Sequence, residues 1–148
     1  MSLDTMHLAR LLTAASRAAQ DHVVRVLEQD HADQSWGAQI GPGLTQADVA
    51  RLLNVTVQAV SKNKGLLRLE NRDGRPVYPI VQFDGRRALP GVAEVVAILH
   101  GPLLPLTIAS WLTSTKKALA GRTAIEALRA GEVGLVEGLA RQTAAAAA

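Results

Sequence analysis

The sequence predicts a mainly α-helical protein with a helix-turn-helix, a small β-hairpin after it and a C-terminal helical bundle. Apolar residues recur at three- and four-residue spacing over most of the chain, and the period changes to two only between residues 67 and 83. Gly and Pro separate the periodic segments. The length of 148 residues suits one domain or two very small ones. Of these residues 48% are hydrophobic but only 3% are aromatic, so the apolar side chains are mostly small, which favours closely packed helices.

The pattern divides the chain into four parts. We expect an N-terminal amphipathic helix within residues 1–29, the helix-turn-helix with its hairpin in residues 44–87, a helical domain in residues 88–143 and a frayed alanine tail in residues 144–148. A polar stretch broken by Gly and Pro, residues 30–43, is typical of a linker.

The first predicted element is a long helix from Asp4 to about Glu28. A single apolar stripe runs along it, and Asp4 or Thr5 is suited to cap its start. The stripe needs a partner surface, because apolar side chains on one face of a helix are stable only when they are covered. That surface is either the rest of the chain or a second copy of the chain, in a dimer.

Two short helices, Gln46–Leu53 and Thr56–Lys64, have the spacing of a helix-turn-helix. Ala50 is small where the two helices cross, and Asn54 tolerates the left-handed backbone that the turn requires. Thr45 stands where a cap begins the first helix. The four positions that such a unit buries are all apolar: Val49, Leu53, Val55 and Val60.

A change of period marks the hairpin that follows. Apolar residues alternate in residues 67–69, Asp73-Gly74 offers a turn, and residues 77–83 are rich in β-branched and aromatic side chains. Pro76 and Pro79 lack a backbone N–H group, so we expect this second arm to be an edge strand.

Helical spacing returns after Pro90-Gly91. The first helix of this part ends before Gly101-Pro102 and has one apolar face: Val92, Val95, Val96 and Leu99. A second short helix has a similar face: Ile108, Trp111 and Leu112.

The last helices carry recognisable end signals. Thr123 and Glu126 have the spacing of a capping box, and Gly131 stands at a C-terminal cap position. A final helix begins at about Glu132 and is expected to bury one face: Val133, Val136, Leu139 and Ala140. The five alanines after it have nothing to pack against, so we expect them to fray.

The positive charge is concentrated in the middle of the chain. The net charge is +3, whereas residues 45–87 alone carry eight basic and four acidic side chains. Clustered cations indicate contact with a polyanion, and a solvated charged face is the alternative. In a DNA reader the second helix enters the major groove, where Gln58 reads an adenine edge, while the hairpin lies along the phosphate backbone. The predicted DNA contacts are Thr56, Gln58, Ala59, Ser61, Lys62, Lys64, Arg68, Arg72 and Arg75.

Catalytic and metal-binding constellations are weak. The chain has no Cys, its four His show no metal-ligand spacing, and no Gly-rich loop is placed to hold phosphates. We therefore expect no enzyme, no metal site and no cofactor.

The longest uncharged apolar stretch contains Gly and Pro residues, so we do not expect it to be a membrane-spanning helix. With no disulfide framework, a reducing cytoplasm fits the composition.

The order of motifs from residue 45 onward resembles the Xre/MbcA/ParS family of antitoxins, the partners of RES-domain toxins. The matching segments cover about two-thirds of the chain and begin with the helix-turn-helix. The others are Gly74-Arg75, Tyr78–Phe83, Leu89-Pro90-Gly91, Ala109–Leu112, Leu119–Gly121, Thr123–Leu128, Gly131 and Ala140-Arg141.

This resemblance implies a dimeric antitoxin without enzymatic activity. It would repress its own operon by binding operator DNA, while its C-terminal region occludes the active site of a RES-type toxin that consumes NAD. A two-fold dimer places the two recognition helices about one DNA turn apart. The implied toxin contacts are Trp111, Leu112, Lys116, Lys117, Arg141 and Gln142. Trp111 is either a core residue that supports this face or a direct anchor.

Two other functions remain open at the level of sequence. One is an orphan winged-helix transcriptional regulator of phage or plasmid origin, without a toxin partner. The other is a structural adaptor with no role in nucleic-acid binding. The regulator predicts sequence-specific DNA binding, whereas the adaptor predicts none.

Overall fold

The computed structural model describes residues 38–148 together with positions 10, 16, 17, 19 and 20. The chain divides into two compact units, Met1–Trp36 and Gly37–Ala148. The predicted helix from Asp4 to Glu28 and its capping residues therefore lie almost entirely outside the described residues. The parts that the sequence separated at residue 88 belong to one compact unit.

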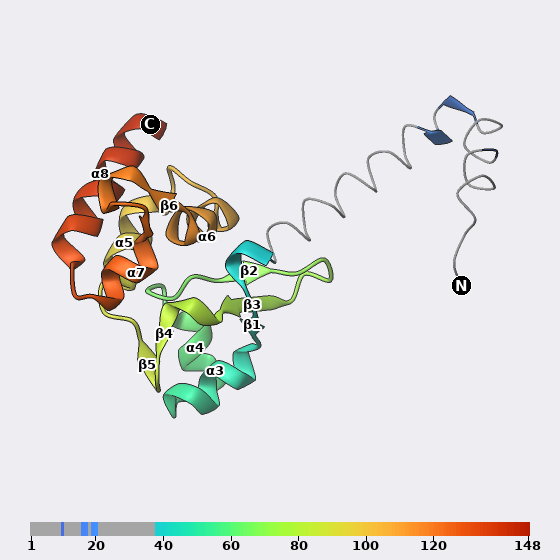
Figure 1. Ribbon diagram of the computed structural model, residues 1–148. Coiled ribbons are helices and arrows are strands. Elements are labelled where there is room, and N and C mark those ends of the chain that lie inside the picture. Colours follow the sequence, from blue (N-terminus) through green and yellow to red (C-terminus); the bar gives the residue numbers. More distant parts are fainter. Residues whose placement is uncertain (1–9, 11–15, 18, 21–37) are drawn as a thin grey trace. The chain divides into compact units, whose positions relative to one another are not determined.

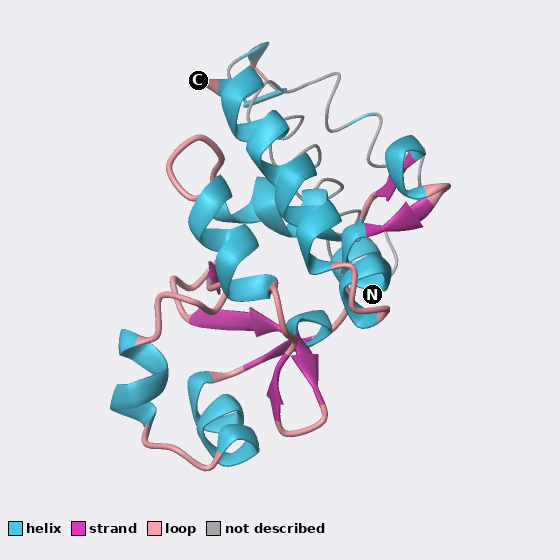
Figure 2. Cartoon of the chain, turned by 90° about the vertical axis from the view of Figure 1, so that its left-hand side faces the viewer, coloured by secondary structure: helices cyan, strands magenta, loops and turns pink. Residues whose placement is uncertain are grey.

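The second unit is mainly α-helical with small antiparallel strand pairs, which confirms the predicted fold class. Strands β1–β3 lie between the helix-turn-helix and the C-terminal helices (Figures 1 and 2). In chain order the elements are β1 (Gly43–Leu44), α3 (Gln46–Leu53), α4 (Val57–Lys62), β2 (Leu69–Glu70), β3 (Pro76–Pro79), η1 (Ile80–Gln82), β4 (Phe83–Asp84), β5 (Arg87–Ala88), α5 (Val92–Leu99), α6 (Pro105–Thr113), β6 (Thr115–Lys116), η2 (Lys117–Leu119), β7 (Arg122–Thr123), α7 (Ala124–Arg129) and α8 (Val133–Ala147).

Residues 38–43 belong to this fold, so the predicted linker is wrong for its last part. Residues 38–40 form a helical turn in which Ile40 is buried, and Gly43 begins β1. The side-chain nitrogen of Gln39 donates to hydroxyl oxygens of α6 and its C-cap: Ser110, Thr113 and Ser114, at 3.1–3.2 Å. The polar composition hid these partners because they lie more than 70 residues further along the chain.

The helix-turn-helix forms with the predicted caps and turn. Thr45 Oγ1 accepts a hydrogen bond from the Asp48 backbone, and the Asp48 carboxylate accepts one from the Thr45 backbone, so a complete capping box begins α3. Asn54 is left-handed, with φ 56° and ψ 50°. The second helix, α4, ends at Lys62 and not at Lys64, because Asn63 is already extended.

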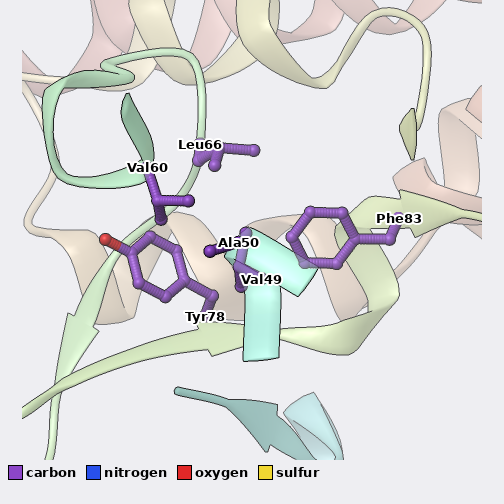
Figure 3. Packing of buried hydrophobic residues seen from close by; sticks show 6 residues of the cluster. All are labelled: Val49, Ala50, Val60, Leu66, Tyr78 and Phe83. Carbon is purple, nitrogen blue, oxygen red and sulfur yellow. The ribbon is translucent and has the colours of Figure 1, made fainter. Parts of the chain in front are cut away.

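A buried cluster joins the two helices to the strands (Figure 3). Its members are Val49, Ala50, Val60, Leu66, Tyr78 and Phe83. Leu53 packs against the cluster and is half-buried. Val55 was expected inside but is 45% exposed. Its N–H group closes the turn by donating to the Ala50 carbonyl oxygen, and its side chain stays at the surface of the turn.

The hairpin is present, but its second arm is not an edge strand. β3 pairs antiparallel with β2 on one side and with β1 on the other, in the order β1-β3-β2. Pro76 and Pro79 are the first and last residues of β3, so their missing N–H groups fall at its ends and leave the pairing between them intact. The strand expected to run through residue 83 is broken after Pro79 by the 3-10 turn η1.

The C-terminal helices bury the apolar faces that the sequence predicted. Val92, Val95, Val96 and Leu99 of α5 are buried, as are Ile108 and Leu112 of α6. Thr123 and Glu126 form the predicted capping box of α7, and Gly131 has the expected positive φ of 82°. In α8, Val136 and Ala140 are buried, whereas Val133 and Leu139 are half-buried.

Two features of this part differ from the prediction. The alanine run was expected to fray, but α8 continues through Ala147, in keeping with the high helix propensity of alanine. The sequence also gave no sign of the short pair β6–β7, in which Thr115 lies opposite Thr123. The turn between these strands passes through left-handed conformations at Ala120 and Gly121.

Candidate nucleic-acid interface

The second helix of the helix-turn-helix presents a polar surface on a fixed base. Thr56 caps α4, because its hydroxyl oxygen accepts a hydrogen bond from the Ala59 backbone at 3.0 Å. Val60 is 1% exposed and anchors the helix in the buried cluster. The remaining residues of α4 are exposed, so the helix offers a complete outer face to a partner.

All nine predicted DNA-contacting residues lie at the surface: Thr56, Gln58, Ala59, Ser61, Lys62, Lys64, Arg68, Arg72 and Arg75. Thr56 to Lys62 belong to α4 and its cap. Lys64 follows the end of the helix and Arg68 immediately precedes β2. The last two arginines lie in the turn of the first hairpin.

The turn of the β2–β3 hairpin, residues 71–75, is held by its own hydrogen bonds. The Asn71 side-chain oxygen accepts from the backbone N–H groups of Asp73 and Arg75, at 3.0 and 2.9 Å. The Asn71 N–H group donates to the Arg75 carbonyl oxygen at 3.0 Å, and Gly74 supplies the positive φ of 75°. A short polar side chain and a glycine thus fix a turn that carries exposed arginines.

The charges of the helix-turn-helix are arranged unequally between its two helices. On α3, the Arg51 guanidinium is ion-paired with the Asp48 carboxylate. Hydrogen bonds from the Thr45 backbone and hydroxyl, together with Arg51, lower the pKa of Asp48. By contrast, the side chains of Lys62, Lys64, Arg68 and Arg75 make no ion pair within the described part of the chain. Uncompensated cations therefore gather around α4 and the hairpin.

A second hairpin, β4–β5, was not predicted from the sequence. Arg86 and Arg87 belong to it and to the basic segment of residues 45–87, and neither had a predicted role. Both side chains are exposed, and Gly85 beside them has a positive φ of 61°. The signal in the sequence was Gly85, because glycine is typical of the first loop position in one of the two common two-residue hairpin turns.

The predicted toxin-contacting residues divide between surface and core. Lys117, Arg141 and Gln142 are exposed, and Arg141 lies 3.8 Å from the Glu137 carboxylate. Leu112 is fully buried, so its side chain supports the core and makes no direct contact with a partner.

Trp111 is half-buried at the junction of three elements. Its indole Nε1 donates to Thr143 Oγ1 of α8 at 3.0 Å, and Lys116 Nζ lies 4.2 Å from the ring centroid. Burial lowers the pKa of Lys116. Trp111 thus has a structural role between α6 and α8 while the residue as a whole is only partly buried.

Other kinds of site find little support in the described residues. No three His, Asp or Glu side chains among them are placed to hold a metal ion. Within the same residues, no helix combines the length and apolar character needed to cross a bilayer.

Comparison with known proteins supports the fold. No family model matches the chain, and no curated protein matches it. Among solved structures, it is similar to the NMR structure of Rv2175c, with a TM-score of 0.61 and 23% sequence identity. The similarity covers 70% of this chain and 81% of that chain. At this level of identity it bears on the fold alone.

Proposed function

We propose that this protein binds duplex DNA through its helix-turn-helix and regulates transcription. The observation that carries the proposal is the outer face of α4, which consists of exposed residues, while Val60 anchors the helix in the buried cluster. A helix of this kind enters the major groove with its N-terminal residues toward the base edges.

The residues of α4 and its surroundings suit different parts of a duplex. Gln58 is exposed near the start of α4, where an amide side chain is able to bind the N6 and N7 positions of adenine. Lys62 and Lys64 lie at and beyond the other end of the helix, where cations position a protein by binding phosphates. The arginines of the β2–β3 hairpin extend the cationic surface along the backbone.

Antitoxin activity is a second candidate. It rests on the resemblance described above and on one structural observation, the partly exposed Trp111 with Lys116 over its ring. Tryptophan is enriched in the centre of protein interfaces. Co-expression with a RES-domain toxin tests this candidate: growth is rescued if the chain neutralises the toxin, and a failure of rescue contradicts it. A cytoplasmic homodimer belongs to the same proposal.

Selection from a randomised duplex library tests DNA binding. We expect the protein to enrich a defined site and to bind it more tightly than an unselected duplex. Gln58→Ala is expected to relax the preference at one base pair and to cost about 1–3 kcal/mol of discrimination there. Lys117→Ala is the control, because Lys117 is an exposed residue of η2, outside the helix-turn-helix and its hairpin. An absence of duplex binding at low salt contradicts the proposal.

A further inference from the structure

The second hairpin is built on the core of the helix-turn-helix. Phe83 of β4 is 5% exposed and belongs to the same buried cluster as Val49 and Val60. Ala88 of β5 lies opposite Phe83 and packs against that cluster. Neighbouring residues of a strand point to opposite faces, so the next pair, Asp84 and Arg87, faces away from the core.

Contacts behind the hairpin hold its base in place. The Arg129 guanidinium of α7 donates to the carbonyl oxygens of Val81 and Phe83, at 3.2 and 3.3 Å. The Leu89 N–H group donates to the Gln82 carbonyl oxygen at 2.7 Å. The first end of the hairpin is thus held by α7, and the two ends of the hairpin are hydrogen-bonded to each other.

The tip is a tight turn that presents two cations. The pairing of Asp84 with Arg87 leaves Gly85 and Arg86 as a two-residue loop, and Gly85 supplies the positive φ that such a turn needs at its first position. A Cβ atom added at Gly85 would meet nothing within 4 Å, so the tip is open to a partner.

The two arginines differ in how their charge is compensated. Arg87 lies 3.9 Å from the Asp84 carboxylate, with both side chains well exposed, and such a pair is weak in water. Arg86 makes no ion pair within the described residues. The tip therefore keeps a net positive charge. Guanidinium groups are well suited to bind phosphate oxygens, which they contact through two parallel hydrogen bonds.

We infer that the β4–β5 hairpin is a second DNA-binding arm, in which Arg86 and Arg87 bind phosphates of the duplex. This inference rests on the proposed DNA binding by α4. In Figure 1 the β4–β5 hairpin and the tip of the β2–β3 hairpin lie on opposite sides of α3 and α4. The two arms would contact the backbone on either side of the segment read by α4. The second arm adds affinity and length to the bound site without adding sequence preference.

Hydroxyl-radical footprinting on a duplex carrying the selected site tests the second arm. The double variant Arg86→Ala/Arg87→Ala is expected to lose protection at one edge of the footprint and to keep the selected sequence preference. Log affinity falls linearly with log salt, and each lost phosphate contact makes this fall shallower by about 0.9 in slope. Arg86→Lys/Arg87→Lys retains both charges and is expected to keep the wild-type slope. An unchanged footprint and slope in the alanine variant overturn the inference.

A matched charge removal separates local contact from net charge. Lys117→Ala/Arg141→Ala also removes two exposed cations, but from η2 and α8. We expect this variant to keep the full footprint, and a loss of protection at the same edge in both variants overturns the inference. If the wild-type protein binds no duplex, the proposed function itself fails. If the wild-type protein binds and the Arg86→Ala/Arg87→Ala variant has the same footprint and the same salt dependence, the second arm alone is wrong.

Discussion

The side-chain amide of Gln82 makes two hydrogen bonds to the backbone of Leu67. Its oxygen accepts from the Leu67 N–H group at 2.7 Å, and its nitrogen donates to the Leu67 carbonyl oxygen at 2.9 Å. Gln82 is fully buried. This pair joins the segment that leaves α4 to the turn that precedes β4, so it closes the loop that carries the first hairpin.

Gln82→Leu is expected to lower the free energy of unfolding by about 3 kcal/mol. The substitution leaves the buried N–H and C=O groups of Leu67 without partners, and each unsatisfied group costs roughly 1–3 kcal/mol. Urea denaturation measures the change. Gln58→Leu on the exposed face of α4 is the control and should leave stability almost unaltered. Equal stability of wild type and Gln82→Leu would show that the amide pair does not hold the loop.

Gly91→Ala is expected to destabilise the fold by about 2–3 kcal/mol. Gly91 has a φ of +94°, and a Cβ atom there would lie 2.7 Å from Leu128 Cδ2 and 3.1 Å from the Val133 methyl carbons. Gly134→Ala is the matched change in α8, where a Cβ atom meets nothing within 4 Å, and it should stabilise by up to about 1 kcal/mol. Thermal unfolding of both variants measures the two changes in stability. If Gly134→Ala is destabilised and Gly91→Ala is not, the close packing of Gly91 against Leu128 and Val133 is contradicted.

Ala120→Gly is expected to stabilise the protein by about 1 kcal/mol. Ala120 has a φ of +57°, a conformation that an L-residue with a Cβ atom adopts at a cost of roughly 1–2 kcal/mol. Its side chain is exposed, so the substitution removes little packing. Asn54 is the other non-glycine residue with a positive φ in the described part of the chain, and Asn54→Ala should lower stability because alanine tolerates this conformation less well than asparagine. Chemical denaturation of both variants checks the signs, and a destabilised Ala120→Gly would be inconsistent with them.

The capping box of α3 predicts a dependence of stability on pH. Hydrogen bonds from Thr45 and Arg51 lower the pKa of Asp48 below that of the unfolded chain, which is about 3.9. The resulting stabilisation is present above that pH and is lost as the pH falls through the lower pKa of the folded state. The stabilities of wild type and Asp48→Asn should therefore converge below about pH 4. A difference that is the same at every pH would rule out this contribution of the carboxylate.

Sequence patterns identified the elements whose determinants are local. Ala50, Asn54 and Val60 specify the helix-turn-helix within a short window, and Thr123 with Glu126 specifies the start of α7. The five residues of α4 and its cap that were predicted to contact DNA are at the surface because they fall on the outward side of the helix-turn-helix pattern, and the other four lie in the loop and hairpin turn that follow it.

Features that depend on distant partners were not evident from the sequence. β3 was expected at an edge because it contains two prolines. The sequence pattern did not indicate that Gly43 and Leu44 form a strand that pairs with it. The partners of Gln39 lie more than 70 residues away, and the polar stretch around it therefore resembled a linker. In the candidate site, the arms of the β4–β5 hairpin are too short to show a periodic pattern.

The central claim is that the cations around α4 bind DNA phosphates, and the salt dependence of duplex binding tests it. The association constant is measured over a range of salt concentrations for the wild type, for Lys62→Ala/Lys64→Ala and for the control Lys117→Ala/Arg141→Ala. We predict a linear fall of log affinity with log salt for the wild type and the control, and a slope shallower by about 1.8 for the double variant in α4 and its following loop. Wild-type binding that is absent or independent of salt, or an identical slope in all three proteins, would contradict the claim.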